Sequence, residues 1–157
     1  MLTLRDPTPD DVPEILSLIR ELATYERDPD AVATTEADLL RDGFGGDPRF
    51  HVVIAEWNGA VAGMAFWFLN YSTWRGKPGI YLEDIFVRQA FRRRGIGRAL
   101  ILRLGAIARE RSYDRLVLQV LDWNQPAIEF YRSLGAKTMG EWITMRFDEG
   151  GIAGLVP

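Results

Sequence analysis

The 157-residue sequence contains no cysteine and only one histidine, His51. Without cysteine there can be no disulfide, no thiolate-bound zinc and no cysteine nucleophile. A single histidine makes a multi-histidine metal site hard to assemble, so we expect no metal cofactor. The alternating residues around His51 indicate a strand, and we place this histidine at the strand's end.

Long apolar segments and an excess of basic residues are also missing. No segment approaches the roughly 18 uninterrupted apolar residues of a membrane-spanning helix. The first six residues lack the basic start and apolar run of a signal peptide, so we expect a cytoplasmic protein with no membrane partner. The formal net charge of −3 disfavours a nucleic-acid partner, because phosphate binding requires a basic face. An acidic surface suits a cationic substrate instead.

What is present is the pattern of one mixed α/β domain over residues 1–157. Apolar residues make up 47% of the chain, which is enough for a core at this length. Asn58-Gly59, between two segments rich in aromatic and β-branched residues, predicts a hairpin turn. The periodicity predicts the order β-α-α-β-β-β-α-β-α-β. The predicted strands are 2–5, 50–57, 61–71, 79–87, 115–121 and 142–147, and the predicted helices are 9–23, 35–43, 98–108 and 126–134.

The first chemical signal is the turn Arg92-Arg93-Arg94-Gly95-Ile96-Gly97, between the fourth predicted strand and a helix. Glycine lets a ligand approach the backbone, and unpaired N–H groups at a helix start bind anions such as pyrophosphate. Taken alone, the segment also fits a solvent-exposed turn with hydrated arginines. It is neither a Walker loop nor a dinucleotide fingerprint, because the latter requires glycine where this chain has Leu100.

This turn resembles the R/Q-x-x-G-x-G/A acetyl-CoA signature of the GNAT superfamily. Downstream, the run from Asp122 to Tyr131, followed by Gly135-Ala136, resembles the other recurring segment of that superfamily. Within it, the chain is most similar to the spermidine/spermine (diamine) N-acetyltransferase branch over residues 3–148, with 149–157 as a tail. The likeness includes Glu21-Leu22-Ala23-x-Tyr25-Glu26, Asp38-Leu39-Leu40-x-Asp42-Gly43-Phe44-Gly45, Trp74-x-Gly76-Lys77 and Tyr81-Leu82-Glu83-Asp84.

The resemblance implies a fold, a cosubstrate and an oligomeric state. The fold is a mixed, mostly antiparallel twisted sheet, splayed between its fourth and fifth strands and flanked by about four helices. The cosubstrate is acetyl-CoA, and a homodimer is expected. Asn124 either contacts the pantetheine or caps a helix, since asparagine is also a preferred cap. The implied cofactor contacts are the backbone of Phe86 and Val87, Arg92, the amides of Arg93, Arg94, Gly95, Ile96, Gly97 and Arg98, and also Asn124 and Tyr131.

The chemistry of amine acetylation directs attention to Glu83 and Asp84. An alkylamine has a pKa of about 10.4, so the site must bind a cation and then remove a proton. Two successive acids are unfavourable within an apolar strand unless they have a role or mark a solvated strand end. Neighbours on a regular strand face opposite sides, whereas the resembled family has a bulge here. We expect Asp84 to anchor the amine and Glu83 to act as base or to position water.

Tyr131 occupies the position where the family keeps the acid that protonates the leaving thiolate. A phenol with a pKa of about 10 can supply that proton, although an aromatic residue also packs well against Phe130. A backbone N–H near Ile85 would stabilise the oxyanion. Without cysteine, we expect direct transfer in a ternary complex.

Tyr25, Glu26 and Trp74 match cleft residues of the diamine branch, because acids and aromatic faces both bind ammonium groups. The alternative interpretation of these three residues is ordinary surface packing. The segment between Gly135 and Trp142 is shorter than in typical diamine enzymes, so the substrate stays open between a polyamine or diamine and a lysine-like amino acid such as thialysine. Two other functions remain to be weighed: a non-catalytic acyl-CoA-binding regulatory module, and an interaction domain without a ligand.

Overall fold

The computed structural model describes all 157 residues, which form two compact units, Met1–Gln119 and Val120–Pro157. The expectation of one domain over the whole chain therefore stays a prediction. None of the helices combines the length and the apolarity that crossing a bilayer requires.

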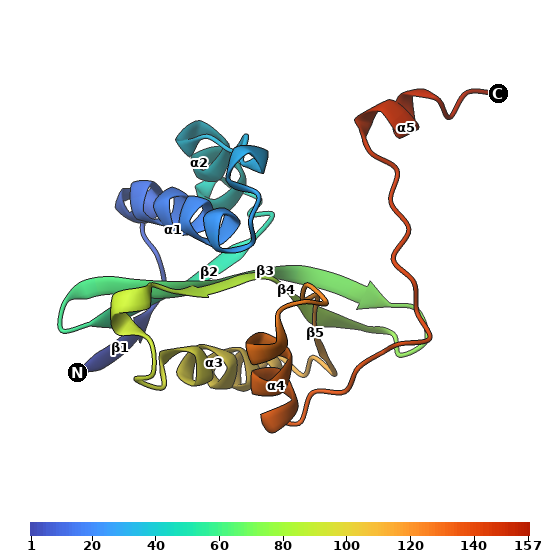
Figure 1. Cartoon of the computed structure of the whole chain (residues 1–157). Helices are drawn as coiled ribbons and strands as arrows, with labels where there is room; N and C mark the ends of the chain where they lie inside the picture. Colours follow the sequence, from blue (N-terminus) through green and yellow to red (C-terminus); the bar gives the residue numbers. More distant parts are fainter. The chain divides into compact units, whose positions relative to one another are not determined.

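A five-stranded sheet with the order β1-β2-β3-β4-β5 organises the first unit (Figure 1). The first three pairs of neighbouring strands are antiparallel, and β4 and β5 are parallel. The turn between β2 and β3 consists of Asn58 and Gly59, both with positive φ, as the sequence predicted for a two-residue hairpin. The mixed, mostly antiparallel sheet is thus confirmed. The strands are β1 Leu2–Arg5, β2 His51–Trp57, β3 Ala60–Ser72, β4 Lys77–Val87 and β5 Leu116–Leu118.

Helices cover both faces of this sheet (Figure 1). The helices α1 (Val12–Tyr25) and α2 (Glu36–Phe44) lie on one face, and α3 (Ile96–Glu110) lies on the other. Each face has its own core, because alternate strand residues point to opposite sides. The α1-side core contains Ile15, Leu16, Leu18, Val52, Ile54, Met64 and Phe86, and the α3-side core contains Val53, Ala65, Trp67, Ile80, Leu82, Leu100 and Leu104.

The sheet loses strand pairing at two places. Pairing between β4 and β5 covers only Ile80–Leu82 and Leu116–Leu118, so the segment 83–87 of β4 has no partner on that edge. The family resemblance placed the splay at this edge, and the splay itself stays a prediction. Pairing between β1 and β2 stops at Arg5 and Ile54, so the segment 51–53 of β2 has no partner on the β1 side. Backbone groups at an unpaired edge are free to bind other groups.

The second unit contains α4 (Gln125–Ser133) and α5 (Glu149–Ala153) but no strand. The predicted strand 142–147 is therefore wrong. Its alternation is strand-like, but a strand needs a hydrogen-bonding neighbour, and Val120–Pro157 offers none. Side chains of this segment are exposed. The short helix α5 lies in the segment expected to be a tail, and Asp148 caps it by accepting a bond from the N–H of Gly151.

Candidate active site

A β-bulge in β4 brings the two successive acids to the same face of the sheet. Phe66 of β3 lies opposite Asp84, and Trp67 lies opposite Leu82, so Glu83 is an extra residue in the ladder. Leu82 belongs to the α3-side core and Phe86 to the α1-side core, although regular alternation would place both on one side. Alternation counted forward from Leu82 places Glu83 on the α1 side. Alternation counted back from Phe86 places Asp84 on the same side. A regular strand would have separated them.

Electrostatics around these acids are unusual because the negative charges are not balanced. Burial, and then the charges of Glu83 and Glu26, raise the pKa of Asp84 from 3.8 to about 6. Burial also raises the pKa of Glu26, which follows the end of α1. No arginine or lysine forms an ion pair with any of the three. We call Glu26, Glu83 and Asp84 the acid cluster, and its missing counter-charge suits a cationic ligand.

Tyr81 also lies beside the acid cluster, and sequence reasoning gave it no role. Burial and the charge of Glu83 raise the pKa of its phenol, and its ring stacks on Phe68 with 5.0 Å between centroids. The available signal was its position two residues before Glu83, which places both side chains on one face of a strand.

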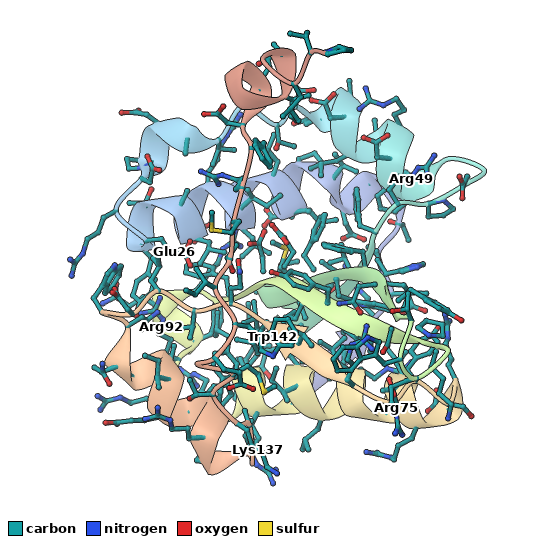
Figure 2. All side chains as sticks on the ribbon, turned by 90° about the vertical axis from the view of Figure 1, so that its right-hand side faces the viewer. Glu26, Arg49, Arg75, Arg92, Lys137 and Trp142 are labelled. Atoms are coloured by element: carbon teal, nitrogen blue, oxygen red, sulfur yellow. The ribbon has the colours of Figure 1, made fainter.

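Arg92 connects the end of α1 to the end of β4. Its guanidinium carbon lies 5.0 Å from the centroid of the Tyr25 ring and 5.6 Å from that of Phe86. Its Nε donates a hydrogen bond of 3.0 Å to the carbonyl of Val87. Figure 2 shows Arg92 and Glu26 at the same end of the first unit. Residues proposed for the cofactor and for the substrate thus meet at this point.

The start of α3 leaves its first amides without partners. Its cap is Gly95, with φ of 76° and no side-chain hydrogen bond to the first turn. In contrast, α2, α4 and α5 are capped by side chains of Thr35, Asn124 and Asp148. The first backbone bond of α3 runs from the N–H of Ala99 to the carbonyl of Gly95, which leaves the N–H groups of residues 96–98 available. Exposed Arg93, Arg94 and Arg98 surround this turn, so the local residues fit a pyrophosphate.

Of the three further candidate residues, one lies in the first unit but far from the acid cluster, and two lie in the second unit. Trp74 lies in the turn between β3 and β4, is 87% exposed and lies about 20 Å along the strand from Asp84. Asn124 and Tyr131 belong to the second unit. The Asn124 side chain accepts a bond from the N–H of Ala127, so it is a helix cap. Tyr131 lies in α4, where its ring makes an edge contact with Phe130 at 5.2 Å.

Comparison with known proteins decides the family. Residues 12–136 match the model of the Acetyltransferase (GNAT) family. The chain belongs to this GNAT family. The thialysine N-epsilon-acetyltransferase of Bos taurus is 39% identical over 156 residues, covering 92% of this chain and 91% of that protein. The spermidine/spermine N(1)-acetyltransferase-like protein 1 of Homo sapiens is 41% identical over 148 residues, covering 88% of this chain and 21% of that protein.

Solved structures share the fold of this chain. An integron cassette protein of V. cholerae has a TM-score of 0.81 at 25% identity, covering 97% of this chain and 95% of its own. An aminoglycoside acetyltransferase from a soil metagenomic sample, solved with sisomicin, has a TM-score of 0.78 at 19% identity, covering 94% and 95%. The second likeness concerns the fold alone. Together with the family match, the named relatives confirm that this GNAT protein is an N-acetyltransferase enzyme, which disfavours the non-catalytic alternatives.

Proposed function

We propose that this acetyltransferase moves the acetyl group of acetyl-CoA to a primary amine of a small cationic substrate, by direct transfer in a ternary complex. The observation that carries the proposal is the acid cluster, three carboxylates without a cationic partner beside an unpaired strand edge. The substrate class is a polyamine, a diamine or a lysine-like amino acid. The names of the relatives, for thialysine and for spermidine/spermine, support this class.

The start of α3 and the end of β4 are the proposed cosubstrate site. Arg92 and the amides of residues 93–98, of which those of 96–98 start the helix without a backbone partner, would hold the pyrophosphate, because positive charge and helix-start amides both favour an anion. The unpaired edge of β4 at Phe86 and Val87 would accompany the pantetheine. When bound, acetyl-CoA supplies the thioester whose acetyl group passes from sulfur to nitrogen.

The acid cluster would perform both tasks that a protonated amine requires. Above about pH 6 Asp84 is a carboxylate and binds an ammonium group, aided by the negative charge of Glu26. Glu83 then accepts the proton that the amine must lose before it attacks, directly or through water. Tyr25, which is 39% exposed, borders this site, and its ring already carries the Arg92 guanidinium at 5.0 Å.

Tyr131 is the proposed acid for the departing thiolate. The pKa of a phenol is about 10 and that of a thiol about 8.5, so the phenol donates only to a thiolate within hydrogen-bond reach. The N–H of Ile85, next to the bulge, is the proposed oxyanion donor. Tyr131→Phe should lower kcat by about 10²-fold with a smaller change in KM. Phe130→Tyr, which keeps both rings, is the matched control and should retain activity.

The decisive experiment measures release of free CoA thiol from acetyl-CoA with a panel of amines. The panel contains thialysine, lysine, spermidine, 1,3-diaminopropane and the aminoglycoside sisomicin. We expect thiol release to depend on an added lysine-like amino acid or polyamine, and mass spectrometry should find one acetyl group on the amine. Release that proceeds equally without any amine, or that requires only sisomicin, contradicts the proposal.

A further inference from the structure

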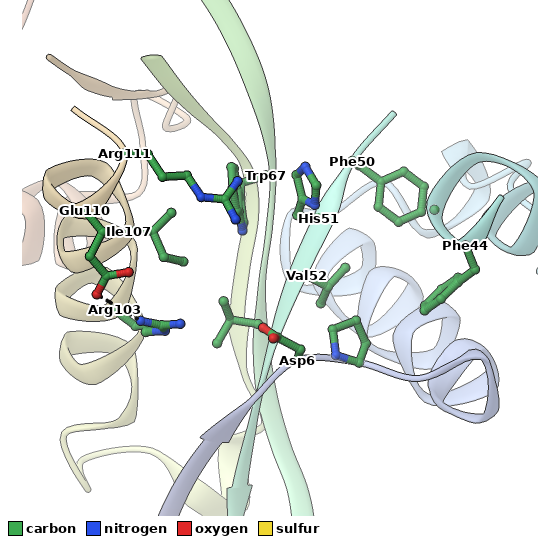
Figure 3. A pocket seen from close by; sticks show the side chains of 13 residues that line it. Asp6, Phe44, Phe50, His51, Val52, Trp67, Arg103, Ile107, Glu110 and Arg111 are labelled. Atoms are coloured by element: carbon green, nitrogen blue, oxygen red, sulfur yellow. Dashed lines mark ion pairs between the residues drawn. The ribbon is translucent and has the colours of Figure 1, made fainter. Parts of the chain in front are cut away.

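A cavity lies in the first unit where the pairing of β1 with β2 ends. Its volume is about 280 Å³, and Figure 3 shows α3 on one side of it and α2 on the other. The cavity exists because β1 ends at Arg5 while β2 begins three residues before the partner of Arg5. Asp6 and Pro7 then turn away towards α1, and the edge of β2 is left uncovered. None of its lining residues belongs to the acid cluster or to the turn before α3.

A buried donor without a partner lines this cavity. Trp67 is 3% exposed, and its indole Nε1 is the one buried side-chain polar atom that has no hydrogen bond. An indole N–H is a donor only, and burying it unpaired is unfavourable, so buried tryptophans usually meet an acceptor. The Trp67 ring also lies against the His51 ring, with 4.6 Å between centroids.

Arg111 brings a second donor to the same place. Its side chain forms no ion pair or hydrogen bond, and it lines the same cavity as Trp67 (Figure 3). The pKa of His51 is lowered by burial and then by the charge of Arg111, and the charge of Asp6 acts in the opposite direction. A guanidinium and an indole N–H both only donate, so neither satisfies the other. An acceptor between them would satisfy both.

The acids on the lining do not supply this acceptor. Glu110 lies 3.7 Å from Arg103 and is paired with it. Asp6 stands well apart from Arg111 in Figure 3, at the opposite end of the cavity. The rings of Phe44 and Phe50 and the side chain of Ile107 add apolar surface to a lining that also includes the polar side chains of His51 and Arg103. The cavity therefore combines some apolar surface with an end where the Trp67 N–H and the Arg111 guanidinium both lack an acceptor.

We propose that this cavity is a second ligand site, which binds a small carboxylate with an apolar body. The carboxylate would pair with the Arg111 guanidinium and accept the Trp67 N–H, while the body contacts the apolar walls. A guanidinium and a neighbouring N–H match the two oxygens of a carboxylate. The site is separate from the proposed acetyl-transfer site, so the two proposals fail independently.

The test uses benzoate as the probe and benzamide, its neutral analogue, as the matched ligand control. Titration of the ¹⁵N-labelled protein is followed by the indole N–H signals, and Trp67→Phe serves only to assign the Trp67 signal. Benzoate should shift that signal with a Kd on the order of 1 mM, typical of a ligand this small with one charged contact. Benzamide should shift the same signal with a Kd that is at least about tenfold higher.

The matched protein variants are Arg111→Gln and Arg109→Gln, because Arg109 is a nearby exposed arginine that does not line the cavity. We expect Arg111→Gln to weaken benzoate binding at least about tenfold and Arg109→Gln to leave it unchanged. Absence of a benzoate-dependent shift of the Trp67 signal overturns the proposal. An unchanged shift in Arg111→Gln, or equal shifts with benzamide, does so as well.

Discussion

The two places where the sheet of the first unit loses a neighbouring strand make similar gaps with opposite chemistry. At β4 the gap beyond Leu82 lies beside the acid cluster, where carboxylates lack a counter-charge. At β2 the gap before Ile54 lies beside Trp67 and Arg111, where donors lack an acceptor. In both cases the edge of one strand extends beyond its paired neighbour. The side chains then decide whether that space suits a cation or an anion, so one fold can hold two kinds of site.

The largest expected effect comes from removing the charge of Asp84. Asp84→Asn keeps the shape of the side chain but can no longer bind an ammonium group as a counter-ion, so kcat/KM should fall about 10³-fold. Steady-state kinetics with the best amine of the panel measure this. Asp47→Asn, at an exposed ion pair with Arg49, is the control and should change kcat/KM less than about twofold. Full activity of Asp84→Asn would show that the acid cluster does not bind the substrate.

The same substitution should stabilise the protein at neutral pH. The folded state binds the Asp84 proton more tightly than the unfolded chain, because the pKa is raised from 3.8 to about 6. The ionised carboxyl therefore lowers the free energy of unfolding above about pH 6 and has no such effect below about pH 4. Asp84→Asn should raise that free energy by up to about 3 kcal/mol at pH 7.5.

Urea unfolding of both proteins across pH 4–8 checks this. The difference between variant and wild type should shrink as the pH falls from about 6 to about 4, and it should vanish below that range. A constant difference over the whole pH range would mean that packing, and not the buried charge, determines the stability of this position.

Much of this fold was readable from local patterns, and the misses have physical causes. The hairpin at Asn58-Gly59 and the existence of the helix that the arginine-rich turn leads into depend on residues close in sequence, so they were predicted, although α3 begins at Ile96, two residues before the predicted start. The bulge at Glu83 depends on register against β3, which no local pattern fixes. The wrong strand at 142–147 has the alternation but no neighbouring strand in its unit. A segment with strand-like alternation forms a strand only where a neighbouring strand can pair with it.

The residues of the candidate sites were likewise predictable where they form a local motif and not where they depend on packing. Asp84 and the arginine-rich turn were identified because each is a local motif. Glu26 lies 58 positions before Asp84 in the sequence, yet its charge raises the pKa of Asp84. This proximity results from the packing of α1 on the sheet, which no local pattern predicts. The cavity beside Trp67 was not foreseen, because it results from the early end of β1 and leaves no motif in the sequence.

Neutralising Glu83 should have a smaller effect, which is a shift in the pH dependence of kcat/KM. Its negative charge contributes to the raised pKa of Asp84, so Glu83→Gln should lower that pKa. In the wild type, kcat/KM should fall below about pH 6 as Asp84 gains a proton. In Glu83→Gln, the residual activity should keep its plateau to a lower pH. An acidic limb that stays in place would show that another group controls it.

The smallest expected effect is at the opposite gap, where the charge of Arg111 is exposed rather than buried. Arg111 follows the last residue of α3, and a positive charge there interacts favourably with the helix dipole. Arg111→Gln should therefore lower the free energy of unfolding by no more than about 0.5 kcal/mol. Benzoate at ten times its Kd should stabilise the wild type by about 1.4 kcal/mol and the variant much less. If Arg111→Gln alone costs several kcal/mol, the arginine holds the end of α3 in place, and its charge is not free for a ligand.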